Sequence, residues 1–179
     1  MLEPILQGFS SQLITVLLGS EKNNGLTASN NIISIAINDN GDIFAGTFNT
    51  GIFRSIDNGE SWIQINNGLT LPNIRMIVFN DSGHVFVSSA PSPFQGGVFR
   101  STNNGDNWIA VNNGLPFGAI FTVSIDSNNN IYAGSGFGSG VYISTNNGDS
   151  WNATGLTNAT TVSLTIDKSS NIIYVGTLY

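Results

Sequence analysis

The chain has 179 residues, of which 40% are hydrophobic, enough for one domain with a sizeable core. Its net charge is −6, and the five lysines and arginines lie far apart, which excludes the basic surface that nucleic acid or anionic lipid requires. The absence of cysteine excludes disulfides and thiolate metal sites.

The N-terminal segment, residues 1–29, is the least regular part of the chain. Its longest apolar run, Leu13–Leu18, is too short to span a membrane. Glu3 precedes that run and no lysine or arginine does, unlike the basic start of a signal peptide, so we expect no export signal in this chain. The motif Asn-Asn-Gly-Leu at 23–26 returns twice later. We expect two degenerate strands here, with a short helix as the alternative.

Residues 30–69 show the repeating unit, which has four short strands, called A to D here, joined by turns. Runs of β-branched and aromatic residues predict strands at 31–37, 43–48, 52–55 and 62–65. The dipeptide Asn40-Gly41 between strands A and B is typical of tight hairpins. A second Asn-Asn-Gly-Leu motif at 66–69 closes the unit.

The same order returns in residues 73–115 and 119–157, and its first half returns in residues 160–179. Strands of the second unit are predicted at 74–79, 85–87, 97–100 and 108–111, with a long B–C loop at 90–96. Those of the third are predicted at 121–125, 131–134 and 140–143, with strand D starting at Trp151. The last unit offers strands at 162–166 and 172–176. We expect residues 1–179 to form a single domain or segment.

Each complete unit carries one copy of an eight-residue turn motif between strands C and D. The copies read Ser-Ile-Asp-Asn-Gly-Glu-Ser-Trp, Ser-Thr-Asn-Asn-Gly-Asp-Asn-Trp and Ser-Thr-Asn-Asn-Gly-Asp-Ser-Trp, with tryptophans 46 and 43 residues apart. Asp or Asn fixes such a turn by accepting backbone N–H groups, glycine adopts a positive φ, and tryptophan covers the turn. The shared positions are therefore expected to be structural: Ser55, Asp57, Gly59, Trp62, Ser101, Asn103, Gly105, Trp108, Ser144, Asn146, Gly148 and Trp151.

A unit of about 43 residues with four strands is typical of a β-propeller blade. One such sheet cannot bury both of its faces, whereas blades stacked around an axis can. The sequence therefore predicts an all-β fold, a β-propeller with three full blades and a split or partial fourth. A β-helix solenoid is the alternative architecture. Residues 8–19 take the C–D phase that the last unit lacks, so the fourth blade could close a ring, but we expect an open segment of a larger propeller.

The turn motif resembles the Asp-box, also called the BNR repeat, of sialidase-like propellers and of large secreted bacterial repeat proteins. The similarity covers residues 30–179, and three copies in phase with the strands make it specific. In that family the Asp-box lies at the C–D hairpin and is structural rather than catalytic. Asn103 and Asn146 depart from the family's Asp, which argues against chemistry shared by the three turns.

The resemblance directs the search for catalysis to the sialidase pattern, which has three converging arginines, a Tyr–Glu pair and an Asp acid. Arg54 and Arg100 occupy one position in successive units, where the third unit has Ile143, so they follow the repeat and are not expected to form a clamp. Arg75 lies on strand A, outside the repeat pattern. If strand A is innermost, as in that family, Arg75 faces the central channel.

The remaining candidates for chemistry are expected to be ordinary turn residues. Most of the acids lie in predicted turns, which favour Asp, whereas glycoside hydrolysis needs two carboxylates across a cleft. His84 is the sole histidine and is expected at an exposed turn, so a multi-histidine metal site is excluded. The run Asn38–Asp42 lacks the spacing of an EF-hand loop. We expect no metal and no cofactor.

These observations favour a non-catalytic module outside the cell or on its surface, acting as a scaffold or binding protein or carbohydrate. The localisation rests on few charges, many amides and hydroxyls, and no cysteine. The candidate binding residues are Arg75 and, in the B–C loops, Phe94 and Phe137. The alternatives are a fragment of a sialidase- or xyloglucanase-like glycoside hydrolase and a structural spacer. An open segment is also expected to pair with further blades or with itself.

Overall fold

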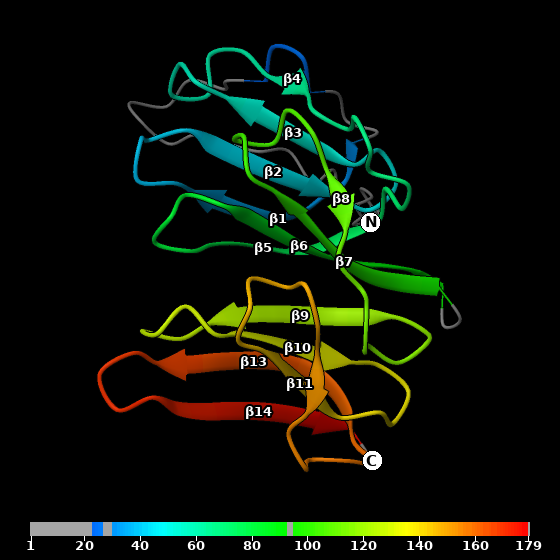
Figure 1. Ribbon diagram of the computed structural model, residues 1–179. Coiled ribbons are helices and arrows are strands. Elements are labelled where there is room, and N and C mark those ends of the chain that lie inside the picture. The colour runs from blue at the N-terminus through cyan, green and yellow to red at the C-terminus, as the bar shows by residue number, and fades with distance from the viewer. Residues whose placement is uncertain (1–22, 27–29, 93–94, 179) are drawn as a thin grey trace, which may run out of the picture.

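The computed structural model describes residues 23–26, 30–92 and 95–178. Within these residues the protein is all-β, with 14 strands in four antiparallel sheets (Figure 1). Three sheets have four strands and one has two, and we call them the first to fourth blades in chain order. No helix in this part of the chain is long and apolar enough to cross a membrane.

The strands follow one another in each blade from A to D. The first blade has β1 (Ile32–Ile37), β2 (Ile43–Thr47), β3 (Ile52–Ser55) and β4 (Ile63–Gln64). The second has β5 (Ile74–Phe79), β6 (Val85–Ser92), β7 (Gln95–Ser101) and β8 (Ile109–Ala110). The third has β9 (Ile120–Ile125), β10 (Ile131–Ser135), β11 (Val141–Ser144) and β12 (Asn152–Ala153). The fourth has β13 (Thr160–Asp167) and β14 (Ile172–Leu178).

This arrangement confirms the predicted fold of propeller blades, although several strands differ in extent. The D strands are only two residues long. Tryptophan hydrogen bonds to the preceding blade also hold the outer edge of the second and third blades. The loop predicted at 90–96 is wrong in length: β6 runs to Ser92 and β7 begins at Gln95, and these two residues pair with each other. Residues 1–22 and 27–29, where degenerate strands are expected, lie outside the described residues.

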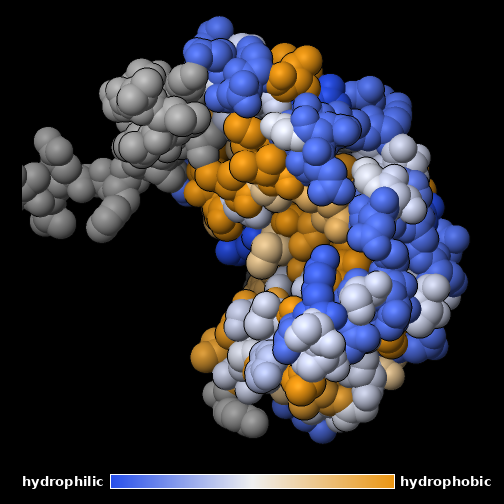
Figure 2. Space-filling view, turned by 90° about the vertical axis from the view of Figure 1, so that its left-hand side faces the viewer, coloured by the Kyte–Doolittle hydropathy of each residue, from blue (hydrophilic) through white to orange (hydrophobic). Residues whose placement is uncertain are grey.

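The A strands form the inner edge of the blades. β1, β5, β9 and β13 pack against one another in this order, so each blade contributes its first strand to the central axis. Figure 2 shows the described blades as a crescent around a hollow that is open on one side and lined largely by hydrophobic residues. The described part of the protein is thus an open arc of a propeller.

The hydrophobic core consists of layers between consecutive blades. The layer between the first and second blades includes Phe44, Ile52, Ile77, Phe99 and Trp108. The next two layers are centred on Phe86, Val111, Val123 and Trp151, and on Tyr132, Val141 and Leu164. Successive strand residues point to opposite faces of a blade, so every interior blade contributes to two layers.

Burial of an A strand depends on the preceding blade. One position of strand A pairs with the same position of strand B in every blade. In the second to fourth blades it is occupied by Ile77, Val123 and Leu164, and all three are buried. Ile35 holds the same position in β1 and is 50% exposed. An equivalent residue in an equivalent strand is therefore buried only where another blade covers it.

Candidate functional site

The three motif copies form closed turns, called Trp turns below. In the first, Ser55 Oγ accepts the backbone N–H of Gly59 at 2.8 Å, and Asp57 accepts the backbone N–H of Ser61 at 2.9 Å. In the second and third, an asparagine accepts the equivalent backbone N–H at 3.0 Å. Asparagine thus replaces aspartate without loss of the turn geometry, because both provide a side-chain oxygen at the same place.

Asp57 gives the first Trp turn a dependence on pH. Hydrogen bonds from the Ser61 hydroxyl, the Ser61 backbone N–H and the Ser55 hydroxyl lower the pKa of Asp57 from 3.8 to about 2. Since the folded pKa lies below the ordinary value, the stabilisation by this carboxylate is complete above about pH 4 and is lost as the pH falls through about 2. We expect Asp57→Asn to leave stability at pH 7 nearly unchanged and to flatten its decline between pH 4 and 2.

Unfolding curves of the wild type and of Asp57→Asn at several pH values test this expectation. Asp167 also has a pKa lowered to about 2, by Ser170 and Ser169, so Asp167→Asn is the matched variant outside the Trp turns. An unchanged acid dependence in Asp57→Asn, together with a carboxyl titration near pH 4 by NMR, would contradict the assignment of the shift to this turn.

Trp108 and Trp151 join the second and third Trp turns to the preceding blade. The backbone N–H of Trp108 donates to the carbonyl of Asn67 at 2.8 Å, and its indole N–H donates to the carbonyl of Ile65 at 2.7 Å. Trp151 makes the same pair of bonds to Asn113 and Val111. The motif is therefore a joint between blades as well as a turn, which the sequence did not reveal.

Charged and polar side chains cross the same joints. Arg54 pairs with Asp106 at 3.0 Å and Arg100 pairs with Asp149 at 2.8 Å, in each case from strand C to the Trp turn of the next blade. The two arginines follow the repeat, as expected from sequence, and do not form a clamp. His84, expected at an exposed turn, is instead half-buried with Nδ1 at 3.2 Å from Oδ1 of Asn147.

The inner A strands share a β-bulge, at which one residue of strand A has no partner on strand B. In all four blades the pairing of strands A and B skips one A residue, and the skipped residues are Ile33, Arg75, Phe121 and Val162. A bulge redirects its extra residue and is often found beside functional sites. Arg75, Phe121 and Val162, together with Met76, line one cavity of about 290 Å³. The repeated bulge therefore assembles a site from three different blades.

Arg75 is the polar centre of this cavity. Its guanidinium carbon lies 5.6 Å from the ring centre of Phe48 and 5.8 Å from that of Phe121, distances typical of cation–π contacts. Its Nε is buried and has no hydrogen-bond partner. Among the described residues Arg75 has neither an ion pair nor a hydrogen bond, unlike Arg54 and Arg100. Rings from the two flanking blades thus hold a guanidinium whose donors are free.

Phe137 extends the aromatic cluster to the surface. Its ring meets that of Phe121 edge to face at 5.8 Å and is 59% exposed. Phe137 has a φ of 60°, and every other non-glycine residue with positive φ in the described chain is an asparagine. Asparagine tolerates this conformation, whereas a bulky aromatic residue adopts it at a cost of order 1–3 kcal/mol. Backbone strain of this kind clusters at functional sites, so Phe137 is a candidate for one.

The structure therefore brings two of the three predicted binding residues, Arg75 and Phe137, to one place through Phe121. Phe94 lies outside the described residues. Sequence reasoning missed Phe48, Phe121 and Val162. Phe121 and Val162 occupy bulge positions, so a comparison of these positions among the four units would have identified both. A bulge position, however, is recognised only from the pairing of two strands.

The acidic side chains of the described residues lie along one edge of the blades. All nine acids in the described residues lie in or next to the A–B turns and the Trp turns, on the left in Figure 1: Asp39, Asp42, Asp57, Glu60, Asp81, Asp106, Asp126, Asp149 and Asp167. The B–C loops and D–A connections meet at the opposite edge, called the acid-free edge below. Within the described part of the chain, Arg75 has the only charged side chain at that edge.

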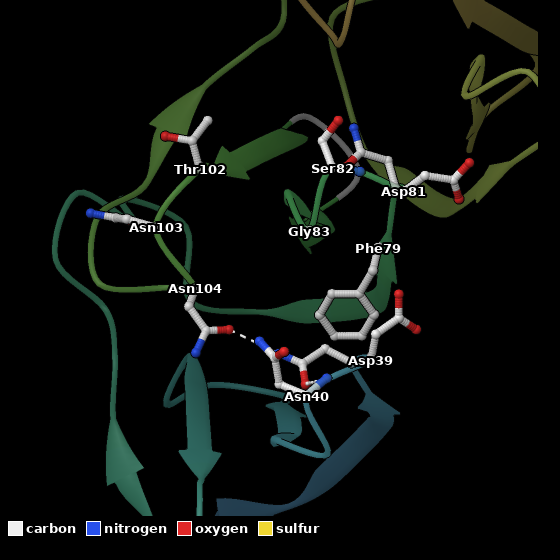
Figure 3. Close-up of a pocket in the computed structure, with 11 residues that line it drawn as sticks. Asp39, Asn40, Phe79, Asp81, Ser82, Gly83, Thr102, Asn103 and Asn104 are labelled. Carbon is white, nitrogen blue, oxygen red and sulfur yellow. Dashed lines mark hydrogen bonds between the residues drawn. The ribbon is translucent and has the colours of Figure 1, made fainter.

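A second cavity, of about 480 Å³, lies at the acidic edge between the A–B turns of the first and second blades and the second Trp turn. Figure 3 shows Asp39 and Asp81 on these two neighbouring turns. The Asn38 side chain donates to Asn104 Oδ1 at 3.0 Å. The pair of carboxylates lies far from Arg75, on the other edge. No group of three or more metal-binding side chains occurs among the described residues.

No protein-family model and no curated protein matches the sequence. Solved structures are similar in fold. An ancestral GH74 enzyme has a TM-score of 0.64 and 21% identity over 87% of this chain and 22% of its own. The GH74 xyloglucanase from Xanthomonas campestris has a TM-score of 0.64 and 18% identity over 84% of this chain and 27% of its own.

A third similar structure is the extracellular domain of a two component system protein from B. thetaiotaomicron. It has a TM-score of 0.63 and 20% identity, over 88% of this chain and 22% of its own. This chain thus spans about a quarter of the length of these structures. At such identities the similarity shows the β-propeller fold alone.

Proposed function

We propose that this chain is a non-catalytic, extracellular β-propeller module that binds carbohydrate at the acid-free edge. The observation that carries the proposal is the strained, exposed ring of Phe137 beside the cavity of Arg75 and Phe121. Aromatic faces bind the apolar faces of sugar rings, and the free guanidinium donors add hydrogen bonds to oxygen. Similar folds in a xyloglucanase and in an extracellular sensor domain support the ligand class and the location.

We also infer that the Trp turns are Asp-boxes, or BNR repeats, and that residues 1–179 form one domain or segment. The turn geometry and the joints to the preceding blade support this inference. In this domain, residues 1–29 supply degenerate C and D strands, the blades cover about 30–69, 73–115 and 119–157, and residues 160–179 form a partial blade. The exposed face of β1 and the exposed Tyr174 of β14 are where further blades or a second copy would pack.

Phe137→Ala is expected to weaken glycan binding about tenfold, because the exposed half of the aromatic platform is lost. A panel of neutral and acidic oligosaccharides is screened first, and the dissociation constant of each bound glycan is then measured by calorimetry for both proteins. Phe117→Ala is the matched control, since Phe117 is 87% exposed on the same edge but lines a different groove. Binding of no glycan would refute the proposal and favour a structural spacer.

The alternative function, a fragment of a glycoside hydrolase, rests on Asp39 and Asp81 in one open cavity. Two carboxylates about 5–10 Å apart across a cleft are the usual requirement for this chemistry. The same glycan panel, assayed for release of reducing ends, separates the two functions. Turnover that Asp39→Asn and Asp81→Asn both abolish would replace the binding module with the hydrolase.

A further inference from the structure

The guanidinium of Arg75 is held in place without a counter-ion. Its Nε is buried, its faces lie against Phe48 and Phe121, and no described acid or carbonyl accepts its N–H groups. Arg54 and Arg100 share the buried Nε, but each also pairs with an aspartate of the next blade. An arginine that lines an open cavity without an ion pair is suited to an anionic ligand, because its planar fork matches a carboxylate in two hydrogen bonds.

The charge distribution supports an anion at this place despite the net charge of −6. Arg75 is the second residue of β5, whereas the acids begin beyond the other end of that strand. A six-residue strand is about 20 Å long, which is about twice the Debye length at physiological ionic strength. The acidic edge is therefore largely screened from the cavity, and the local potential is dominated by Arg75.

The surroundings favour a sugar ring as the carrier of the carboxylate. Phe48, beside the guanidinium, is 41% exposed, and Phe137, which contacts Phe121, is 59% exposed, so two aromatic rings near Arg75 are open to a ligand. The cavity of about 290 Å³ is at the lower limit for small-molecule sites and takes one compact ring. A ring with an apolar face and an attached carboxylate satisfies both features at once, whereas an extended acidic peptide has no apolar ring next to its carboxylate.

We propose that the cavity lined by Arg75, Phe121 and Val162 binds a uronic-acid residue of an acidic oligosaccharide, with its carboxylate on Arg75 and its ring against the neighbouring Phe137 and Phe48. This inference rests on the proposed carbohydrate-binding function and specifies the ligand of the same site. It makes Arg75 the residue that selects acidic over neutral sugars.

Titration calorimetry with trimers of galacturonic and of glucuronic acid, and with their neutral methyl esters, tests the proposal. We expect at least one acidic trimer to bind, its ester to bind at least about tenfold more weakly, and Arg75→Gln to cause a similar loss. Arg75→Lys keeps the charge but not the fork and is expected to be intermediate. Lys168→Gln is the matched control, because it removes one exposed positive charge at the acidic edge and should leave affinity unchanged.

The outcomes separate this inference from the proposed function. Equal binding of acid and ester, or an unchanged affinity in Arg75→Gln, would overturn the carboxylate site but leave a glycan-binding module. Binding of no glycan, acidic or neutral, would overturn both. Binding of hexaglutamate but of no uronate would replace the sugar with an acidic peptide. Circular dichroism melting of Arg75→Gln and Arg75→Lys shows that any loss of binding is not a loss of folding.

Discussion

Trp108→Ala is expected to destabilise the protein by about 3–5 kcal/mol, a large part of the 5–15 kcal/mol that is typical of a domain. The indole is 3% exposed and lies in the core layer between the first and second blades. Its removal leaves a cavity there and leaves the carbonyl of Ile65 without its donor at 2.7 Å. Urea unfolding followed by circular dichroism measures the change in the free energy of unfolding.

Trp108→Phe is the matched variant, because it keeps an aromatic ring in the layer and removes the N–H donor. We expect it to cost about 1–3 kcal/mol, the usual penalty for a buried polar group that loses its partner. A loss below about 1 kcal/mol for Trp108→Ala would show that the indole does not hold the two blades together.

Gly114→Ala is expected to destabilise the protein by disturbing the packing of the second blade against the third. Gly114 has a φ of 92°, and an added Cβ would lie 2.2 Å from the carbonyl oxygen of Trp151. Alanine in this backbone conformation costs about 1–2 kcal/mol, and the steric overlap adds about 1–3 kcal/mol because the Trp turn must move away. Thermal unfolding of the purified variant measures the combined loss.

The chain contains its own control for this substitution. Gly155 also follows a D strand with a positive φ, of 95°, but has nothing within 4 Å of an added Cβ. Gly155→Ala should therefore show only the cost of the backbone conformation. Equal losses in the two variants would mean that the close approach to Trp151 does not limit stability.

Local chemistry explains why so much of the fold was predictable. Strand limits such as those of β3 and β5 follow from runs of β-branched and aromatic residues bounded by turn residues. The Trp turns were assigned correctly as turns, because Ser55 and Asp57 fix the backbone within the same eight residues. The same motif also joins blades, and that role involves carbonyls about 40 residues earlier in the chain, which no local pattern shows.

The candidate site was predicted only in part for a similar reason. Arg75 and Phe137 were identified as single residues that stand outside the repeat, without a common partner. Phe121 connects them, but in the sequence it is an ordinary strand residue. It lines the cavity only because of the bulge in its pairing with β10. A bulge depends on register between strands, and alternation of residue types along one strand does not reveal it.

By itself, the sequence determined the repeat period, the all-β class and the turn chemistry, because each of these depends on interactions within a few residues. The tertiary structure alone decided which side chains from different blades meet. It placed Arg75 between Phe48 and Phe121, linked Arg54 and Arg100 to the next blades, and left Ile35 exposed where its equivalents are buried. These contacts depend on how one sheet packs on the next, and packing brings together residues that no spacing along the chain relates.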